Sequence, residues 1–255
     1  MKRPFFTIIT PTLNSEKYLE ECIKSVESQS FKNLEHIFID SFSKDNTLNI
    51  LRKYKKRNPK KVFIYKYPKK GISDAFNKGI KHSKGKYLNF LGSDDLLEKD
   101  ALKIVYDNMK DGKYSWCYGN FDIINEKGKI IKRKRYKLEN YSYLNLYIHL
   151  YICHQTVFMK KNIFNKYGLF DSKLKYAMDH EYWLRIGKKE FPKYLNNKLC
   201  NFRIDGINVS ANKKDQFFEK NKIIKKYSYT FLFTIILILR YIDFFIFNRK
   251  SNNRY

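Results

Sequence analysis

Two adjacent carboxylates stand where an apolar run of the sequence ends. Asp94 and Asp95 directly follow Gly92 and Ser93, just beyond residues 87–91. Neighbouring carboxylates repel each other, and a hard divalent cation such as Mg²⁺ or Mn²⁺ relieves that repulsion, with substrate phosphates usually completing its ligand shell. The alternative is a helix N-cap, a position that Asp favours. The place after a buried strand favours a metal site.

A third carboxylate ends an earlier apolar run. Asp40 closes residues 36–40, and its side chain could accept a hydrogen bond from a nucleobase or a ribose hydroxyl, although a turn-forming Asp fits equally. Asp74 and Asn77 lie at the start of a predicted helix that follows Gly71. A helix N-terminus near lysines could attract phosphate, whereas an ordinary capped helix explains the same residues.

Polar groups of the second half are ambiguous when taken alone. His154 and Gln155 precede a short predicted strand, and Asp179 opens a predicted helix. A packed histidine and a helix cap are the plain interpretations of these residues. Spacing alone therefore assigns them no catalytic role.

In the first half of the chain, strands are predicted to alternate with helices, and this order would bring the polar side chains at the strand ends together. The predicted strands are 5–10, 36–40, 62–65 and 87–91, and helices are predicted to begin near residues 14, 45, 73 and 99. Such βαβ units form a mainly parallel sheet with helices on both faces. Ligands bind at the carboxyl ends of its strands, which is where the polar segments 10–12, 40–41 and 93–95 stand.

The second half is mixed in character. Short strands are predicted at 116–119, 121–124, 129–136, 156–159 and 199–204, with a helix over 179–188. We expect one continuous domain over 1–215, with a nucleotide-binding half (1–112) and an acceptor half (113–215). Residues 216–255 are predicted to form a basic and apolar helical tail.

Composition narrows the classes of partner. The chain has 255 residues, 43% of them apolar, which suffices for a substantial core, and Lys and Arg outnumber Asp and Glu by 52 to 25, giving a net charge of +27. This excess implies attraction to anions: nucleic acid, anionic lipid or phosphorylated small molecules. The four cysteines form no CxxC pair, which favours reduced thiols in a cytosolic chain over zinc or disulfides.

Nine segments, taken in order and spacing, resemble family 2 glycosyltransferases with the GT-A fold, of the type that builds bacterial surface polysaccharides. The segments are 6–14, 18–19, 25–30, 40–47, 71–80, 85–95, 154–155, 167–171 and 179–185, and the resemblance covers roughly residues 5 to 210. One departure is clear. Many members carry a second Asp where this chain has Ser41 and a glycine where it has Phe42.

The resemblance implies a Rossmann-like GT-A sheet and a hexosyl- or N-acetylhexosaminyltransferase that inverts the anomeric carbon. It assigns the general base to Asp179 and the Mn or Mg ligand to Asp95. The nucleotide-diphosphate sugar, with UDP as the leading choice, and the acceptor would be bound by Thr10, Pro11, Asp40, Asp74, Asn77, Asp94, His154 and Gln155. The acceptor is expected to be a glycan or a lipid-linked hydroxyl.

The tail raises a membrane question. Residues 231–247 form the most apolar run, interrupted by Arg240 and Asp243 and flanked by basic residues on both sides. A spanning helix needs about 20 apolar residues, so an interfacial helix on an anionic membrane surface is favoured over a packed helix or a true span. The predicted location is the cytoplasm, peripheral to the cytoplasmic face of the membrane.

Two other functions compete with transfer of a sugar. The net charge of +27 and the many Tyr and Phe residues would suit a nucleic-acid-binding protein, but the chain has no helix-turn-helix, zinc finger or RNA-binding signature. We therefore expect no nucleic-acid partner. A homologue that binds a nucleotide sugar without turnover is the other alternative, and the presence of Asp95 and Asp179 argues against it.

Overall fold

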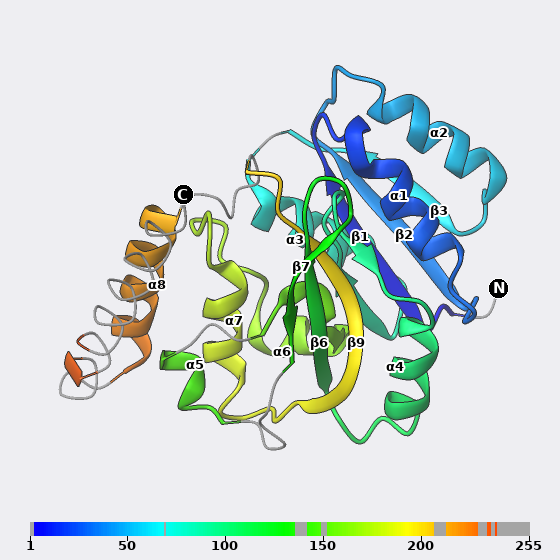
Figure 1. Cartoon of the computed structure of the whole chain (residues 1–255). Coiled ribbons are helices and arrows are strands. Elements are labelled where there is room, and N and C mark those ends of the chain that lie inside the picture. Colours follow the sequence, from blue (N-terminus) through cyan, green and yellow to red (C-terminus); the bar gives the residue numbers. More distant parts are fainter. Residues whose placement is uncertain are drawn as a thin grey trace.

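The computed structural model describes residues 3–68, 70–135, 142–148, 152–206 and 213–228, together with residues 234, 235 and 238. Within these residues, nine strands form one sheet in the order β3-β2-β1-β4-β8-β6-β9-β5, with β7 paired to β6 (Figure 1). The strands are β1 Phe6–Thr12, β2 Leu34–Asp40, β3 Val62–Lys66, β4 Tyr87–Phe90, β5 Leu96–Leu97, β6 Trp116–Ile124, β7 Ile130–Lys134, β8 Phe158–Lys160 and β9 Lys193–Arg203.

Helices connect and cover these strands. They are α1 Glu16–Glu27, α2 Thr47–Arg57, α3 Ile72–His82, α4 Ala101–Met109, α5 Asn145–Ile148, α6 Lys161–Tyr167, α7 Met178–Ile186 and α8 Lys213–Tyr227, with a 3-10 turn η1 at His154–Thr156. The first half follows the predicted alternation, and β1 pairs in parallel with both β2 and β4. The predicted mainly parallel α/β arrangement of this half is confirmed.

Alternating side chains of β1 pack on the two faces of the sheet, as the pleat of a strand requires. Phe6 and Ile8 join α1 and α4 in one apolar cluster. Ile9 joins α3 and α7 in another. Helices therefore cover both faces, as predicted.

Strand β1 continues two residues beyond its predicted end and passes through Pro11. Pairing with β4 ends at Ile9, whereas pairing with β2 continues to Thr12. Past Ile9 one side of β1 is an edge, and proline is tolerated at an edge because it interrupts no ladder there. The predicted end of this strand at residue 10 was wrong for this reason.

The second half corrects a further prediction. Residues 116–119 and 121–124 are not two strands but the single strand β6, whose register against β9 shifts between Gly119 and Phe121. At Gly119 a Cβ would lie 2.7 Å from the Leu199 side chain, so the two strands can approach here only because this residue is glycine. Short elements β5, α5 and α6 were not predicted.

Helix α7 is buried almost all round. Its Trp183 stacks on Trp116 of β6 with ring centroids 5.1 Å apart, and both rings are fully buried. Helix α8 lies on the outer side of α7, away from the sheet (Figure 1). Since α8 begins at Lys213, it crosses the predicted boundary between the domain and the tail, and that boundary stays a prediction.

The apolar run 231–247 lies outside the described residues, except for residues 234, 235 and 238. None of the helices in the described part of the chain combines the length and apolar character that crossing a membrane requires.

The loop after β2 contains a strained residue. Phe42 has φ 59° and its ring is 54% exposed, so a bulky side chain occupies a backbone conformation that costs about 1–2 kcal/mol. We expect Phe42→Gly to raise the free energy of unfolding by about 1 kcal/mol, measured by urea denaturation. Phe42→Ala removes the ring but keeps the strain, so it should bring no gain. A glycine variant less stable than the alanine variant would contradict this explanation.

Candidate active site

A cleft of about 650 Å³ opens at the carboxyl edge of the sheet. It lies between the loops that follow β1 and β4 on one side and η1 and the start of α7 on the other. Five of the predicted site residues line it: Asp94, Asp95, His154, Gln155 and Asp179. Residues separated by more than 80 positions in the sequence therefore meet in one cleft.

Asp95 is held from two sides. Its Oδ1 accepts the backbone N–H of Arg203 at 2.9 Å, and its Oδ2 accepts Nε2–H of Gln155 at 2.7 Å. Burial, together with the neighbouring charge of Asp94, raises the pKa of Asp95 to about 7. A carboxylate this buried beside a second one favours a positive ion in the cleft.

The two carboxylates also converge in space. A methyl group added to Gly92 would lie 2.5 Å from Asp95 Oδ2 and 2.8 Å from Asp94 Oδ1. Neither Asp caps a helix, because β5 follows them and α4 begins only after Asp100. The helix-cap alternative is thus excluded, and the geometry suits oxygen ligands for a hard divalent cation.

The remaining ligands would have to come from elsewhere. Among the described residues, no group of three or more His, Cys, Asp or Glu side chains could hold a metal ion. Two carboxylates whose shell is completed by water and phosphate oxygens are a usual arrangement for Mg²⁺. The donor set therefore fits a cation that is bound together with a phosphorylated ligand.

On the side of the cleft formed by η1 and the start of α7, Asp179 lies beside His154. Asp179 Oδ2 lies 3.6 Å from His154 Nδ1, and its Oδ1 accepts the backbone N–H of His180 at 2.7 Å. Burial alone would raise the pKa of Asp179, but the hydrogen bond and charge of His154, with the N–H of His180, hold it below its usual value. Asp179 is therefore a charged carboxylate, 9% exposed, on the cleft wall.

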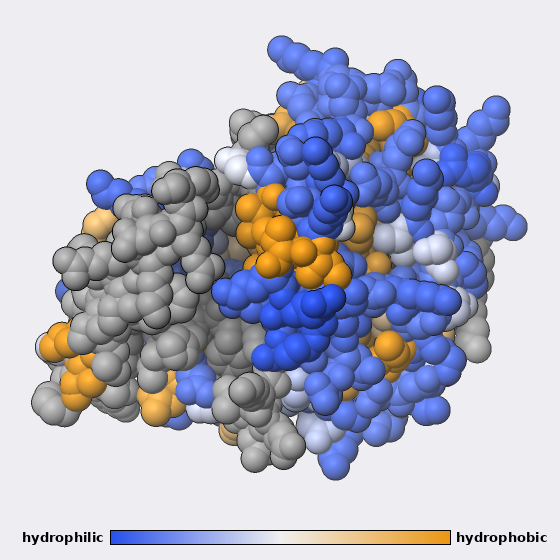
Figure 2. Space-filling view, viewed as in Figure 1, coloured by the Kyte–Doolittle hydropathy of each residue, from blue (hydrophilic) through white to orange (hydrophobic). Residues whose placement is uncertain are grey.

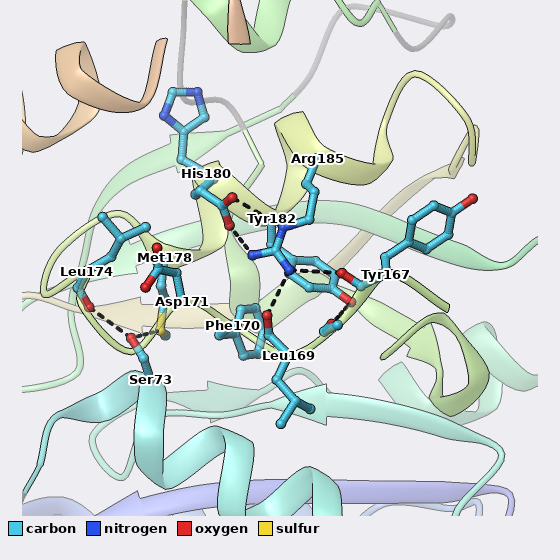
Figure 3. A network of polar contacts seen from close by, with 12 residues as sticks. Ser73, Tyr167, Leu169, Phe170, Asp171, Leu174, Met178, His180, Tyr182 and Arg185 are labelled. Atoms are coloured by element: carbon cyan, nitrogen blue, oxygen red, sulfur yellow. Dashed lines mark hydrogen bonds and ion pairs between the residues drawn. The ribbon is translucent and has the colours of Figure 1, made fainter. Parts of the chain in front are cut away.

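Helix α7, which carries Asp179, is fixed by a polar network (Figure 3). Arg185 Nη1 donates to the carbonyl oxygens of Tyr167 and Leu169 at 3.0 and 2.8 Å. Ser73 Oγ, from α3, donates to the carbonyl of Leu174 at 2.9 Å. These bonds tie the acceptor half to α3 and to the loop that follows α6, so Asp179 is positioned by both halves of the chain.

Three predicted nucleotide-binding residues lie outside the cleft lining. Thr10 is fully buried, with Oγ1 3.0 Å from His36 Nε2, and Pro11 is half-buried in β1. Asp40 is also fully buried, and its carboxylate accepts bonds from Thr12 Oγ1, Ser43 Oγ and Ser43 N–H. In this structure Asp40 shapes the loop after β2, and its contact with a base stays a prediction.

Asp74 and Asn77 do not line the cleft either. The Asn77 amide exchanges two hydrogen bonds with the backbone of Phe170, at 2.9 and 3.0 Å. Asp74 Oδ1 accepts the hydroxyl of Ser172 at 2.8 Å. Both residues join α3 to the loop before α7, and their substrate-binding roles stay predictions.

Several cleft residues were missed by the sequence analysis. The cleft is also lined by Lys17, Tyr18, Lys175 and Asp205. Arg203 supports the loop that carries Asp94 from behind. The Arg203 side chain is fully buried, donates from Nε to the Asp94 carbonyl at 2.9 Å and pairs with Glu21 at 2.6 Å. The signal was available, because Arg203 lies within the predicted strand 199–204, where a charge that becomes buried must have a partner.

The cysteines are free thiols, as expected. Cys22, Cys117 and Cys200 are buried, and Cys153 is half-buried on the cleft wall. Cys153 Sγ donates to Gln155 Oε1 at 2.8 Å, which helps to hold Gln155 against Asp95.

Size alone does not identify the site. A cavity of about 760 Å³ lies at the opposite edge of the sheet, lined by basic residues that include Arg3, Lys60 and Lys84. None of the predicted site residues lines it. The convergence of carboxylates from both halves singles out the cleft at the carboxyl edge.

The sequence is similar to known enzymes. The profile of the family described as Glycosyl transferase family 2 matches residues 7–168. The putative teichuronic acid biosynthesis glycosyltransferase TuaG of Bacillus subtilis is 26% identical over 83% of this chain and 83% of its own length. An uncharacterized glycosyltransferase of Rickettsia prowazekii is 32% identical over 72% of this chain and 58% of its own. Chondroitin synthase of Escherichia coli is 30% identical over 83% of this chain, which spans 31% of that protein.

Solved structures share the fold. S. aureus TarS superposes with a TM-score of 0.70 at 21% identity, covering 96% of this chain and 73% of that chain, and TarS has also been solved with UDP and with UDP-GlcNAc. A mannosyltransferase from Pyrobaculum calidifontis in complex with GDP-Man and Mn²⁺ has a TM-score of 0.70 at 18% identity, covering 94% and 69%. These neighbours confirm the predicted GT-A fold.

Proposed function

Because this chain belongs to glycosyl transferase family 2, we propose that it transfers the sugar of a UDP-sugar, with inversion and release of UDP, to a hydroxyl of a glycan or a lipid-linked acceptor. The observation that carries the proposal is the convergence of Asp94 and Asp95 with His154 and Asp179 in one cleft. The glycosyltransferase activity follows from the family. The donor, the acceptor, the stereochemistry and the metal belong to the proposal.

UDP is favoured by the relatives. TarS has been solved with UDP and with UDP-GlcNAc, and other relatives are named for teichuronic acid biosynthesis and for chondroitin synthesis. The Pyrobaculum enzyme binds GDP-Man instead, so the fold alone does not choose the nucleotide. An N-acetylhexosamine or hexose linked to UDP is the donor class that we propose.

Asp179 would accept the proton of the attacking hydroxyl. Its pKa lies below the usual value of 3.8, so it is ionised at neutral pH and ready to act as a base. His154, 3.6 Å away, keeps the carboxylate facing the cleft. In an inverting transfer the hydroxyl attacks the face opposite the leaving diphosphate, so no enzyme nucleophile is required.

Asp95, with Asp94, would hold a Mn²⁺ or Mg²⁺ ion together with the donor diphosphate. When bound, such an ion neutralises the charge that develops on the leaving group. Gln155 and the Arg203 backbone fix the orientation of Asp95, as groups behind a metal ligand commonly do. The Mn²⁺ in the Pyrobaculum neighbour supports this assignment.

A thermal-shift panel tests the proposed function. UDP-, GDP- and TDP-sugars are each added with and without Mn²⁺, and the melting temperature is measured. We expect a UDP-sugar to stabilise the chain only when Mn²⁺ is present, because ligand bound to the native state raises its stability. Stabilisation by a UDP-sugar without Mn²⁺ would refute the metal assignment. Stabilisation by GDP-sugars alone would refute the donor assignment.

The location of the protein is part of the proposal. The apolar run 231–247 and its basic flanks support peripheral attachment to the cytoplasmic face of the membrane. The coloured part of the face shown in Figure 2 is mostly hydrophilic, and an apolar patch lies over the β6–β7 hairpin. Ile130 and Ile131 of β7 are exposed. The tail is nevertheless the longer apolar segment, and we assign the attachment to it.

A truncation tests the tail. A chain that ends at Ser228 keeps α8 intact, so it should fold and bind a UDP-sugar like the full chain. It should lose most of its binding to vesicles that contain anionic phospholipid, because the apolar run and its last basic residues are gone. Co-sedimentation at moderate salt measures this. Equal sedimentation of both chains would exclude the tail as the anchor.

A further inference from the structure

We propose that helix α8 belongs to the catalytic apparatus and that its Glu219 is a positioning residue for the segment that carries Asp179. The proposal rests on the proposed function, in which Asp179 is the base. It gives the start of the predicted tail a role inside the cleft, separate from any contact with a membrane.

One carboxylate holds three consecutive backbone N–H groups. Glu219 Oε1 accepts the N–H groups of Tyr176 and Ala177, both at 2.7 Å, and Oε2 accepts the N–H of Lys175 at 2.9 Å. Hydrogen bonds to a charged acceptor are shorter and stronger than neutral ones. Residues 175–177 are the last before α7 begins, two positions ahead of Asp179.

The start of α7 needs such a partner. Its N-cap residue is Ala177, which has no side-chain acceptor. The first N–H groups of a helix have no partner within the helix, and a local Ser, Thr, Asp or Asn usually supplies one. Here a carboxylate from another helix binds the N–H of Ala177 and of the two residues before it, so the entry angle of α7 depends on α8.

The far end of α8 is fixed as well. The hydroxyl of Tyr227 donates to Glu181 of α7, and the carbonyl of Tyr227 accepts the hydroxyl of Tyr147 at 2.8 Å. Glu181 is buried and pairs with Arg185, the residue that ties α7 to the loop after α6 (Figure 3). Because α8 is anchored at both ends, it can hold Glu219 in a fixed place.

Helix α8 also reaches the cleft directly. Gln216, one turn before Glu219, lines it together with Lys175, Tyr176 and Asp179. The charge of Lys220, the residue after Glu219, is among the influences that lower the pKa of Asp179. The helix thus supplies backbone support, cleft lining and positive charge at the same place.

Full-length variants test the role of Glu219. Glu219→Ala removes both acceptor oxygens and with them all three hydrogen bonds. Glu219→Gln keeps one oxygen, Oε1, which serves two of the three bonds, and Lys222→Ala changes an exposed position on the same helix. Two quantities are measured: amide hydrogen exchange of residues 175–177, and UDP release from UDP-GlcNAc and UDP-glucose with Mn²⁺, water serving as acceptor. UDP affinity is measured by calorimetry.

We expect Glu219→Ala to speed exchange at 175–177 and to slow UDP release about ten- to a hundredfold, since small displacements of a catalytic group cost that much. UDP affinity should stay within about twofold, and Glu219→Gln should recover much of the rate. Parent-like exchange and release in Glu219→Ala would overturn the proposal. So would an equal loss in Lys222→Ala, which would indicate general damage to the helix.

Asp179→Asn, measured alongside, separates the two levels of inference. Slow release in Asp179→Asn with parent-like release in Glu219→Ala would leave the base in place and remove the positioning role. Parent-like release in Asp179→Asn would instead refute the base assignment itself, and the positioning proposal with it.

Discussion

Asp95→Asn should reduce sugar transfer by about a thousandfold or more while leaving the fold intact. Neutralising the charge of a departing diphosphate is worth several kcal/mol of barrier, and each 1.4 kcal/mol is tenfold in rate. Asparagine keeps an acceptor for the Arg203 N–H, and Gln155 can turn its amide to face the new side chain. Donor-sugar turnover in the presence of Mn²⁺ is the measurement, with circular dichroism to confirm folding.

The stability of this variant provides its own control. Burial already disfavours the charged form of Asp95, whose pKa is raised to about 7, so removing that charge should not lower the melting temperature of the metal-free chain. The stabilisation by UDP-sugar with Mn²⁺ should disappear. Full activity of the parent chain in excess chelator, or turnover of Asp95→Asn with Mn²⁺ at the rate of the parent chain, would contradict the metal role.

The first half of the chain, residues 1–112, could be predicted because its elements are local. In α1, the apolar residues Leu19, Cys22, Ile23 and Val26 recur at helical spacing in the sequence, and all four are buried. Strand ends marked by polar residues predicted the edge where the cleft lies, since parallel strands place their carboxyl ends together. Asp94 and Asp95 were identified by that logic, with no need of long-range contacts.

The second half of the chain was harder to predict because long-range packing decides its form. Strand β6 is continuous through Gly119 only because β9 packs against it with a shifted register. The family resemblance identified Asp179, but its partner His154 lies 25 positions away, and the Glu219 contact comes from 40 positions further along. No spacing rule for a single helix predicts such contacts.

The buried state of Asp40 was also beyond the sequence. A carboxylate at a strand end was expected to face a ligand. The Asp40 carboxylate instead accepts hydrogen bonds from the hydroxyls of Thr12 and Ser43, within the protein. Ser41 and Phe42 depart from the common pattern at the same loop, and Phe42 takes a positive φ. The loop after β2 therefore has its own geometry, and the base-binding role predicted for it is the part of the resemblance that carries over least directly.

Asp179→Asn should lower turnover by roughly 10²–10⁴-fold, the usual contribution of acid–base catalysis. The amide keeps the size of the side chain and can still accept the N–H of His180, but it cannot take a proton from the acceptor. UDP affinity should remain near that of the parent chain, because Asp94 and Asp95 are untouched. Single-turnover release of UDP, with calorimetry for affinity, measures both.

The pH dependence of the parent chain supplies a matched test. With the pKa of Asp179 held below its usual 3.8, protonation of this residue should not limit turnover above about pH 5. His154→Ala removes the hydrogen bond and the charge that lower this pKa and leaves burial, which raises it, so the acid limb assigned to Asp179 should move to higher pH. In Asp179→Asn that limb should vanish from the small residual rate. If Asp179 were only a structural contact of α7, replacing it by Asn would leave turnover nearly unchanged. A residual rate within a few-fold of the parent would therefore assign the base to another carboxylate or to His154.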